Sequence, residues 1–448
     1  MNKNQQLELE CVALGAELEG VCRHEGMAVF VKGMLPGETG RVVITKAEKR
    51  YAFGRLMEVL TKSPQRLSPP CPAYPRCGGC AGLHMTYEAT LKAKRQQVED
   101  VMRRIGGVEV EVRPVKGMAH PWHYRNKTAL PLCETETGVR TGFYAPRSHS
   151  LIPVENCLMA MEPLNAAAKA LRRWMDMTHT PCYDENSHRG LVRHLVARQN
   201  RRGDVMAVVV VNGHALPGWE GLLTELQKDV PHLASLYISI NKEKTNIILG
   251  RQCRLLWGAP TLTDTLCGLN FAVSPQSFFQ VNPEQTEVLY RTALDFAGLR
   301  GDETVADVYC GAGTISLLLA RHCRQVLGIE VVEPAVVNAR ENARANGVEN
   351  ARFITGAAED VLPRLVKEGY RPQVMVVDPP RKGIELPALE AMAAARPEKI
   401  VYVSCNPATQ ARDVGLLTQR GYKVTACQPV DMFCWTAGVE NVVSLVKA

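Results

Sequence analysis

The chain has 448 residues, of which 46% are apolar and 22% are charged, and its formal net charge is +7. This length is too great for one typical core and predicts about three domains, and the composition is that of a globular protein. No apolar run approaches the ~20 residues that cross a bilayer, and the polar N-terminus lacks the apolar segment of a signal peptide. These features exclude a membrane-spanning or secreted chain, so we expect a cytoplasmic protein, and the positive charge favours an anionic partner.

Residues 1–62 are predicted to form a small β-barrel, because short apolar strands at 28–31 and 41–44 alternate with glycine turns. The stretch from 41 to 66 holds two acidic and seven basic residues: Arg41, Lys46, Lys49, Arg50, Arg55, Lys62 and Arg66. Tyr51 and Phe53 lie among them. Basic and aromatic side chains together indicate a surface for nucleic acid, although an ordinary solvated face can have the same composition.

Residues 63–265 are predicted to form a mixed α+β domain. The proline-rich segment at 68–72 marks its beginning, and a helix with a basic stripe is expected over 87–105. Apolar runs predict four strands, at 189–198, 205–211, 236–240 and 245–249.

Fifteen cysteines are present, and in a cytoplasmic protein of this size they do not indicate a disulfide framework. Three of them fall within ten residues that also contain prolines and glycines: Cys71, Cys77 and Cys80. This spacing is typical of a metal or cluster site. Cys157 is the best candidate for a fourth ligand, with Cys133 and Cys182 as competitors. Spacing alone does not distinguish zinc from a [4Fe–4S] cluster.

Residues 266–448 show alternating helix and strand patterns, which predict a doubly wound α/β domain with a mainly parallel sheet. The expected strands are 304–309, 326–330, 352–355, 374–378, 399–404 and 442–446.

A glycine-rich turn, G-A-G-T at 311–314, follows the first of these strands and begins a helix. The next strand ends in Glu330, and a carboxylate at that position typically binds ribose hydroxyls. The turn is G-x-G, without the third glycine of the dinucleotide pattern. A cofactor that has a ribose but no pyrophosphate, such as S-adenosylmethionine, therefore fits better than NAD.

Two further turns follow strands of the same predicted sheet. Prolines in D-P-P-R-K-G (378–383) force the chain out of the sheet and leave Asp378 at its edge. V-S-C-N-P (403–407) places Cys405 in a polar turn, where a thiol can react as a thiolate, although many cysteines are buried and inert. Glu440 precedes the last strand, and its local sequence is that of an ordinary surface residue.

The most specific motifs are S-F-F-Q-V-N (277–282), D-V-Y-C-G-A-G-T (307–314), D-P-P-R-K-G, V-S-C-N-P and the four cysteines. With them the chain resembles, nearly from end to end, the RNA uracil-5-methyltransferase family. It is most similar to the branch that acts on 23S ribosomal RNA and carries an N-terminal TRAM domain and a [4Fe–4S] cluster. The resemblance implies an OB-like RNA-binding barrel, a central iron–sulfur domain, and a Rossmann-like methyltransferase domain that uses S-adenosylmethionine. No membrane association or obligate protein partner is expected.

The resemblance also implies residue roles. Cys405 matches the nucleophile and Glu440 the base. Gln280, Tyr309, Glu330 and Asp378 match cofactor and active-site positions. Cys71, Cys77, Cys80 and Cys157 match the ligands of the iron–sulfur cluster. Two departures are visible: Gly438 stands where relatives often have histidine or another residue, and G-A-A-E (356–359) lacks an asparagine that some relatives place near the adenine.

The implied reaction is methylation of C5 of a uridine in 23S ribosomal RNA. Cys405 adds to C6, which makes C5 nucleophilic, and Glu440 later removes the C5 proton. The base must leave the stack to react, and Phe278 and Phe279 are candidates to stack on it, unless they fill the core.

Three alternatives remain at this stage. A transfer RNA uracil-5-methyltransferase is one. A radical S-adenosylmethionine enzyme is another, although its C-x3-C-x2-C motif is absent and it would need a β/α barrel. A non-catalytic, redox-sensing RNA-binding protein is the third, and the joint presence of Cys405, Asp378 and Glu440 argues against it.

Overall fold

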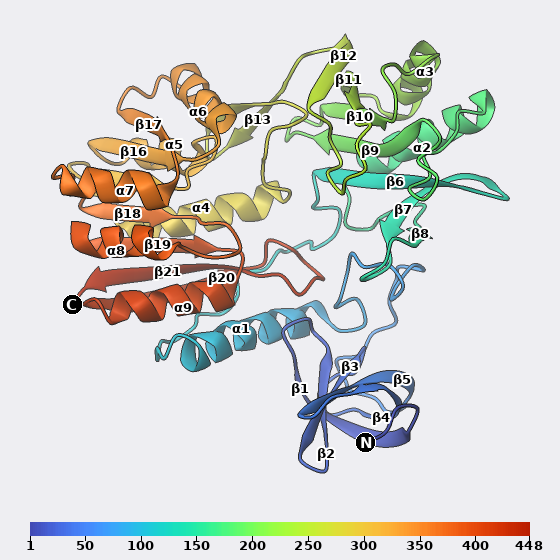
Figure 1. Ribbon diagram of the computed structural model, residues 1–448, viewed down its shortest axis with the longest axis horizontal. Helices are drawn as coiled ribbons and strands as arrows, with labels where there is room; N and C mark the ends of the chain where they lie inside the picture. Colours follow the sequence, from blue (N-terminus) through green and yellow to red (C-terminus); the bar gives the residue numbers. More distant parts are fainter.

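The computed structural model describes all residues from Met1 to Ala448. Figure 1 shows the N-terminal barrel at the bottom, the central sheet at the upper right and the C-terminal sheet between helices on the left, with α1 lying between the barrel and the C-terminal sheet. No helix of the protein has both the length and the apolar character needed to cross a membrane.

The N-terminal segment is a closed five-stranded barrel in the order β1-β2-β3-β5-β4, as the glycine-punctuated pattern predicts. Its strands alternate buried and exposed residues, and a small apolar core that includes Val29, Val31, Val42 and Ile44 fills the interior. The strands are β1 (Gln6–Leu14), β2 (Gly20–His24), β3 (Met27–Lys32), β4 (Thr39–Ala47) and β5 (Tyr51–Thr61).

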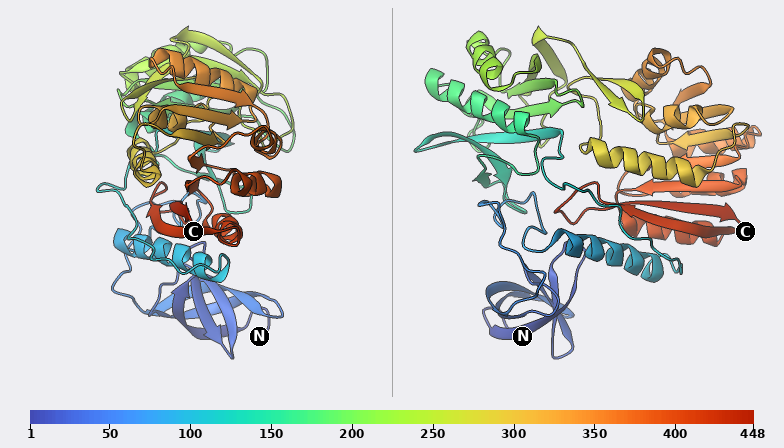
Figure 2. Two further views of the ribbon diagram at one scale, coloured as in Figure 1. Left: turned by 90° about the vertical axis from the view of Figure 1, so that its left-hand side faces the viewer. Right: turned by 180° about the vertical axis from the view of Figure 1, so that it is seen from behind.

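The barrel docks against the beginning of α1 (Tyr87–Arg104), as both views in Figure 2 show. Leu35 of the barrel packs with Met85 and Ala89 at this contact. The fully buried carboxylate of Glu38 is paired with Arg66 at 2.5 Å, which ties the barrel to the segment that follows it. The other end of α1 contributes Val98 and Met102 to the core of the C-terminal domain.

The central sheet has seven strands in the order β12-β11-β10-β9-β6-β7-β8. One face is covered by α2 (Glu162–Thr178) and α3 (Trp219–Asp229), which pack on alternate residues of β6, β9 and β10. The strands are β6 (Lys127–Thr135), β7 (Gly138–Tyr144), β8 (Leu151–Pro153), β9 (Val192–Gln199), β10 (Val205–Val211), β11 (Leu233–Ile240) and β12 (Gln252–Gly258).

The predicted strand at 245–249 is wrong. The edge strand is β12, which begins a few residues later. The amide of Asn241 explains the difference, because its Nδ2 donates to the carbonyl oxygens of Ile247 (2.6 Å) and Ile248 (3.0 Å). A side chain thus satisfies backbone groups that a strand would pair with a neighbour, and the apolar run is held as a loop.

The C-terminal sheet has seven strands in the order β17-β16-β15-β18-β19-β21-β20. The first five are parallel, and β21 and β20 are antiparallel additions. The strands are β15 (Thr304–Val308), β16 (Gln325–Glu330), β17 (Ala351–Thr355), β18 (Val374–Val377), β19 (Lys399–Ser404), β20 (Tyr422–Val430) and β21 (Glu440–Lys447). A hairpin of β13 (Leu262–Leu266) and β14 (Leu269–Val273) precedes this sheet.

Helices cover both faces of the sheet, which confirms the predicted doubly wound α/β fold. Buried residues of α4 (Pro283–Ala297), α5 (Thr314–Ala320) and α6 (Glu333–Ala345) belong to one core. Those of α7 (Ala358–Lys367), α8 (Leu386–Ala395) and α9 (Pro407–Thr418) belong to the other.

Candidate active site

The carboxyl ends of the central parallel strands lie at one edge of the C-terminal sheet. Val308 of β15 pairs with both Ile329 of β16 and Val377 of β18, so the residues that follow these positions, Tyr309, Glu330 and Asp378, meet at that edge. The strand order reverses between β15 and β18, and ligands of open α/β sheets bind at such a reversal.

The antiparallel strand β21 brings in Glu440. Ser404 of β19 is paired with Asn441 of β21. One step further along this register, Cys405 stands opposite Glu440. A strand that ran parallel would have placed Glu440 at the far edge of the sheet, so the direction of β21 creates this pair.

Gln410 holds the two strands at this point. Its buried Nε2 donates to the carbonyl oxygens of Tyr402 (2.8 Å) and Asn441 (3.0 Å), and its Oε1 accepts from Asn441 Nδ2 (2.7 Å). These bonds join β19 and β21 immediately behind Cys405 and Glu440 and fix their separation.

The turn that carries Cys405 is fixed to the loop after β18. Asn406 caps α9 by accepting from Ala408 N (3.2 Å), and its Nδ2 donates to the carbonyl oxygen of Arg381 (3.0 Å). Thr409 Oγ1 donates to the same oxygen (3.2 Å). The D-P-P-R-K-G and V-S-C-N-P motifs are therefore one hydrogen-bonded unit.

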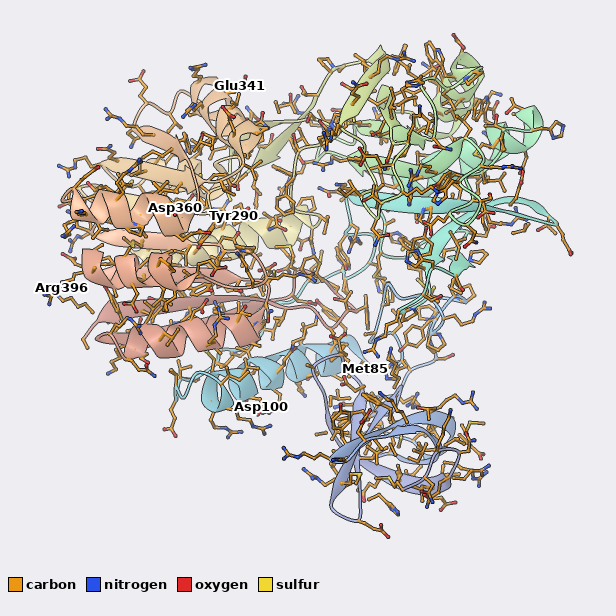
Figure 3. All side chains as sticks on the ribbon, viewed as in Figure 1. Met85, Asp100, Tyr290, Glu341, Asp360 and Arg396 are labelled. Carbon is orange, nitrogen blue, oxygen red and sulfur yellow. The ribbon has the colours of Figure 1, made fainter.

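A cavity of about 990 Å³ opens at this edge of the sheet. Its lining includes all six residues that the sequence predicts for the catalytic and cofactor sites: Gln280, Tyr309, Glu330, Asp378, Cys405 and Glu440. Tyr290 of α4, labelled in Figure 3, lines the same cavity, and its hydroxyl contacts Thr314 Oγ1 at 3.1 Å. Asn338 of α6 and the segment 356–359 also reach the cavity.

Burial and neighbouring negative charges raise the pKa values of the acidic groups around Cys405. Burial, and then the carboxylate of Asp378, raises the pKa of Glu440 to about 8. Burial alone raises the pKa of Asp378 to about 7. Burial and the charge of Glu440 also raise the pKa of the Cys405 thiol, and the guanidinium of Arg381 opposes this rise. Arg381 is thus the cation that favours a thiolate at Cys405.

The glycine-rich turn provides the opposite part of the cavity. Glu330 accepts from the N–H groups of Gly311 (3.1 Å) and Val332 (2.8 Å), which fixes its carboxylate at the end of β16. Gly311 has a φ of 54° and open space where a Cβ would lie, so a ligand can approach the backbone closely there. A Cβ on Gly313 would lie 3.1 Å from Ala339 and 3.2 Å from Phe353, so this glycine permits close helix packing.

Two buried polar atoms near this turn have no partner in the protein. The hydroxyl of Tyr309 is one, on a residue with the rare φ of 69°, and Oδ1 of Asp307 is the other. The second oxygen of Asp307 accepts from Ser316 Oγ, and burial raises the pKa of this acid to about 7. Buried polar groups without partners are rare, and here they line a cavity that is open to a ligand.

The two phenylalanines of S-F-F-Q-V-N differ in their environment. Phe279 is buried and packs against Phe271, with ring centroids 6.0 Å apart, so it belongs to the core. Phe278 is 80% exposed and lines the cavity. Of these two phenylalanines, only Phe278 is free to stack on a base.

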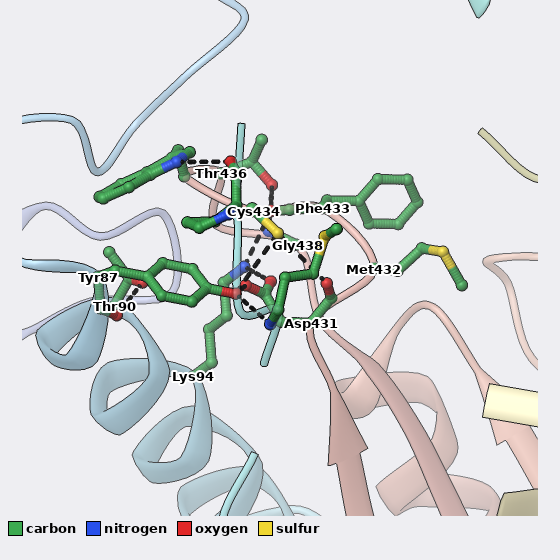
Figure 4. A network of polar contacts seen from close by, with 12 residues as sticks. Tyr87, Thr90, Lys94, Asp431, Met432, Phe433, Cys434, Thr436 and Gly438 are labelled. Carbon is green, nitrogen blue, oxygen red and sulfur yellow. Dashed lines mark hydrogen bonds and ion pairs between the residues drawn. The ribbon is translucent and has the colours of Figure 1, made fainter. Parts of the chain in front are cut away.

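The loop that leads into Glu440 is anchored to α1 through a buried ion pair, shown in Figure 4. Lys94 Nζ lies 2.5 Å from Asp431 Oδ1, with both side chains fully buried, and it also donates to the carbonyl oxygen of Phe433 (2.9 Å). Tyr87 donates to the other oxygen of Asp431 at 2.6 Å. Phe433 lines the cavity, so α1 sets the position of one of its walls.

The four predicted cluster ligands are half-buried, and a charge interaction that raises a pKa links each of them to at least one other. Burial, and then the charges of Cys157, Cys77 and Cys71, raises the pKa of Cys80 to about 12. Burial, with the charge of Cys133 among the smaller causes, instead raises the pKa of Cys182. Neither of these two competitors is therefore grouped with the four predicted ligands. No three His, Cys, Asp or Glu side chains in the protein are close enough together to hold a single metal ion, and the cluster stays a prediction.

Arg381 and Asp307 line the cavity, and neither of them was assigned a role from the sequence. Arg381 directly follows the D-P-P turn, and its place in that motif was a usable signal. Asp307 begins the D-V-Y-C-G-A-G-T motif, but an acid inside an apolar strand gave no indication that one of its oxygens lacks a partner.

Comparisons with known proteins agree with this architecture. The model of the tRNA (uracil-5-)-methyltransferase family matches residues 262–448, and the TRAM domain model matches residues 4–57. An uncharacterised RNA methyltransferase of Clostridium tetani is 44% identical over 444 residues, which are 99% of this chain and 96% of that protein. One from Halalkalibacterium halodurans is 43% identical over 99% of this chain and 98% of that protein.

Among solved structures, the chain is similar to the Pyrococcus abyssi tRNA (uracil-54, C5)-methyltransferase in complex with S-adenosyl-L-homocysteine. The TM-score is 0.79 at 25% identity, over 98% of this chain and 100% of that chain. Together with the relatives that match along nearly their whole length, this shows that the chain belongs to the RNA uracil-5-methyltransferase family.

Proposed function

We propose that this protein transfers a methyl group from S-adenosylmethionine to C5 of a uridine in 23S ribosomal RNA. The observation that carries the proposal is the pairing of Cys405 with Glu440 across β19 and β21, inside the cavity that also holds Tyr309, Glu330 and Asp378. A nucleophile and a base that face one reacting ring are the two groups that this reaction needs.

Cys405 begins the reaction. Its thiolate adds to C6 of the uracil and forms an S–C6 bond, and the ring electrons move to give an enolate that is nucleophilic at C5. Arg381 favours the thiolate before this step. C5 then takes the methyl group from the sulfonium of bound S-adenosylmethionine, the methyl–sulfur bond breaks, and the sulfur leaves as a neutral thioether. Glu440 removes the remaining proton from C5, the S–C6 bond breaks, and the thiolate of Cys405 leaves.

The residues at the glycine-rich turn fit the cofactor. Glu330 stands where a carboxylate accepts from ribose hydroxyls, Gly311 leaves room for close approach, and the unpartnered hydroxyl of Tyr309 offers a hydrogen bond. Gln280 and Asp378 complete the predicted set. S-adenosylmethionine bound there supplies an electrophilic methyl group on a sulfonium.

The four cysteines fit a [4Fe–4S] cluster. Each thiolate of such a cluster binds a different iron atom, so the ligands stand further apart than those of a single ion. Cys71, Cys77, Cys80 and Cys157 interact through their charges, and the N–H groups of Ala81 and Gly82 donate to Trp435 in the loop before Glu440 (2.9 Å each). We assign the cluster a structural role beside this loop.

The cluster has its own test. Protein purified without oxygen is expected to hold about four iron atoms per chain with the visible absorption of a cluster. Cys157→Ser should lose both signals, and Cys182→Ser, the matched control, should keep them. Equal iron in the two variants would remove Cys157 from the ligand set.

We assign the domain functions as the sequence predicts them. Residues 1–62 bind RNA, residues 63–265 carry the cluster and further RNA contacts, and residues 266–448 perform methyl transfer. The barrel supports an RNA surface, because Tyr51 and Phe53 are exposed and lie close to Phe30, with ring centroids 5.5–6.0 Å apart. Aromatic clusters of this kind stack on unpaired bases.

The choice of RNA is tested in cells. We expect 5-methyluridine to disappear from one or more sites of 23S ribosomal RNA when the gene is deleted, as read by mass mapping of ribosomal and transfer RNA. Return of the mark with the intact gene, but not with the Cys405→Ala variant, would assign it to this chain. Loss from transfer RNA alone would favour the alternative, a transfer RNA enzyme like the Pyrococcus abyssi protein.

A further inference from the structure

Three cations of the central sheet gather beside the cavity. Lys127 begins β6, and its direct antiparallel partner on β9 is Arg198. Arg125 precedes β6 by two residues and lines the cavity. None of the three has been given a role by the reaction described above.

The strand register shows which way Lys127 and Arg198 point. Directly paired residues share a face of the sheet, and the neighbouring pair, Thr128 with Ala197, points the other way. Ala197 belongs to the core under α2 and α3. Lys127 and Arg198 therefore lie on the face that no helix covers.

This uncovered face meets the segment that forms one wall of the cavity. Arg198 Nη2 donates to the carbonyl oxygen of Ser277 (2.8 Å), and Asn126 N donates to that of Val281 (2.8 Å). Ser277 and Val281 both line the cavity. The cations are thus placed at the junction between the central sheet and the site of methyl transfer.

No ion pair with a carboxylate neutralises the positive charge of these three residues, although the charge of Asp264 acts on Arg198 and those of Cys80 and Cys157 act on Arg125. The side chains of Arg125 and Lys127 also make no hydrogen bond in the protein, whereas that of Arg198 donates one to a carbonyl oxygen. The Nη1 atom of Arg198 is buried without a partner. The carboxylate that acts on Arg198, that of Asp264, already accepts from the N–H groups of Arg201 (3.0 Å) and Thr265 (2.9 Å).

The arrangement is unfavourable for the free protein. Like charges directly opposite each other on paired strands repel, and burial together with the charges of Arg198 and Arg125 lowers the pKa of Lys127 to about 8. A purely structural role would call for apolar or oppositely charged side chains at these positions. An anion that binds among the three removes the repulsion.

We propose that Arg125, Lys127 and Arg198 bind a backbone phosphate of the RNA next to the uridine that enters the cavity. The proposal rests on the proposed function, since it takes the RNA to be the anion. The site fixes the register of the strand without reading its sequence, as phosphate contacts do. The carboxylate of S-adenosylmethionine is a second anion that these cations could bind. The experiment distinguishes it from an RNA phosphate.

The test combines two half-buried positions whose side chains make no hydrogen bond or ion pair in the protein. Arg125→Gln and Lys127→Met, alone and together, are compared with Lys169→Gln. Lys169 is an exposed cation of α2, on the covered side of the same sheet. Equilibrium binding of a 23S RNA fragment is measured across a range of salt concentrations, and binding of S-adenosylmethionine is measured separately.

We expect the double variant to bind RNA about tenfold or more weakly and to bind S-adenosylmethionine as the wild type does. The slope of log K against log salt should fall by about 0.7, the loss of one phosphate contact on a single strand. RNA affinity and slope equal to those of Lys169→Gln would overturn the proposal, and so would a matching loss of S-adenosylmethionine binding, which would assign the cations to the cofactor. If the wild type binds this RNA but does not methylate it, the proposed function fails while the phosphate site still stands.

Discussion

Glu440 combines two properties that favour a general base. It is buried and makes no ion pair, so its pKa is raised to about 8 and it binds a proton readily. It also faces the strand end that carries Cys405, where the C5 proton of an adduct would lie. Arg381 balances part of the negative charge that Glu440, Asp378 and the thiolate bring together.

Replacement of Glu440 by glutamine should stop the reaction after methyl transfer. Without a base the C5 proton stays, so kcat is expected to fall by about 10²–10⁴-fold while a methylated covalent complex with RNA accumulates. Denaturing gel electrophoresis with radiolabelled RNA detects this complex. Glu368→Gln is the control, because Glu368 is an exposed residue at the end of α7, and it should turn over normally. Asn441 would be unsuitable, since its side chain bonds Gln410. Loss of turnover without any trapped complex would place the role of Glu440 before methyl transfer.

The same variant should change how stability depends on pH. The pKa of Glu440 is raised from 4.5 to about 8 in the folded state, so its neutral form stabilises the fold fully below 4.5 and this contribution is lost as pH rises through 8. Glutamine has no proton to lose. The free energy of unfolding of Glu440→Gln, measured with urea, should therefore rise relative to that of the wild type between about pH 4.5 and about pH 8. A constant difference between the two proteins, as expected for Glu368→Gln, would contradict this.

Sequence alone was sufficient for the residues that stand at strand ends. Asp378 and Cys405 follow apolar runs and precede prolines, so their positions at the sheet edge could be predicted. Glu440 could be assigned only through the family resemblance, because its position depends on the antiparallel direction of β21. The unpartnered Oδ1 of Asp307 depends on the packing around it, which no local pattern encodes.

Among the secondary-structure elements, α1 and the loop from 431 to 439 hold the sheet edge at which Cys405 and Glu440 lie. The ion pair of Lys94 with Asp431 is enclosed completely and is joined by Tyr87. Through the carbonyl oxygen of Phe433 it holds a wall of the cavity, and the loop then leads directly into Glu440.

Lys94→Met is expected to lower the free energy of unfolding by about 3–5 kcal/mol, because it leaves the carboxylate of Asp431 buried without a counter-charge. Chemical denaturation measures this loss. The double variant Lys94→Met with Asp431→Asn should recover part of it, since neither charge then remains. Lys92→Met serves as the control: Lys92 is 67% exposed and pairs with Glu88 on the outer face of the same helix, so its loss should cost about 0.3–0.5 kcal/mol. Equal effects at the two positions would disprove the supporting role of the buried pair.

The elements of the C-terminal sheet were predictable because buried parallel strands are continuous apolar runs that helices separate. The central sheet was harder to predict. T-N-I-I-L at 245–249 has the composition of a strand, but the side chain of Asn241 holds it as a loop, and this bond is set by tertiary structure.

For the whole molecule, the central question is how three parts hold one RNA. The barrel offers an exposed aromatic surface at Tyr51 and Phe53, and the central sheet offers cations without an ion pair beside the cavity. The cavity itself is built by the C-terminal sheet. A chain of RNA that contacts all three would be bound at several sites whose contributions can be measured separately.

Tyr51→Ala with Phe53→Ala should weaken RNA binding by about 1–3 kcal/mol for each stacked base that is lost. S-adenosylmethionine binding and the folded state should not change, because the two rings are 40% and 36% exposed. Fluorescence anisotropy with a labelled RNA measures the difference. Val12→Ala, an exposed apolar side chain on β1 of the same barrel, should bind as the wild type does. An RNA affinity of the aromatic variant equal to that of Val12→Ala would remove the barrel surface from the interface.

The central claim is that Cys405 forms a covalent bond to C6 of the target uracil, and RNA with 5-fluorouridine at the target site tests it most directly. Fluorine replaces the C5 proton that a base must remove before the S–C6 bond can break, so the adduct should persist. Mass spectrometry of the digested complex should find the methylated base on the peptide that contains Cys405. Cys310→Ala, which removes the other thiol of the cavity, should still form the complex, and Cys405→Ala should not. An adduct on Cys310, or normal methylation of ordinary uridine by Cys405→Ala, would contradict the account.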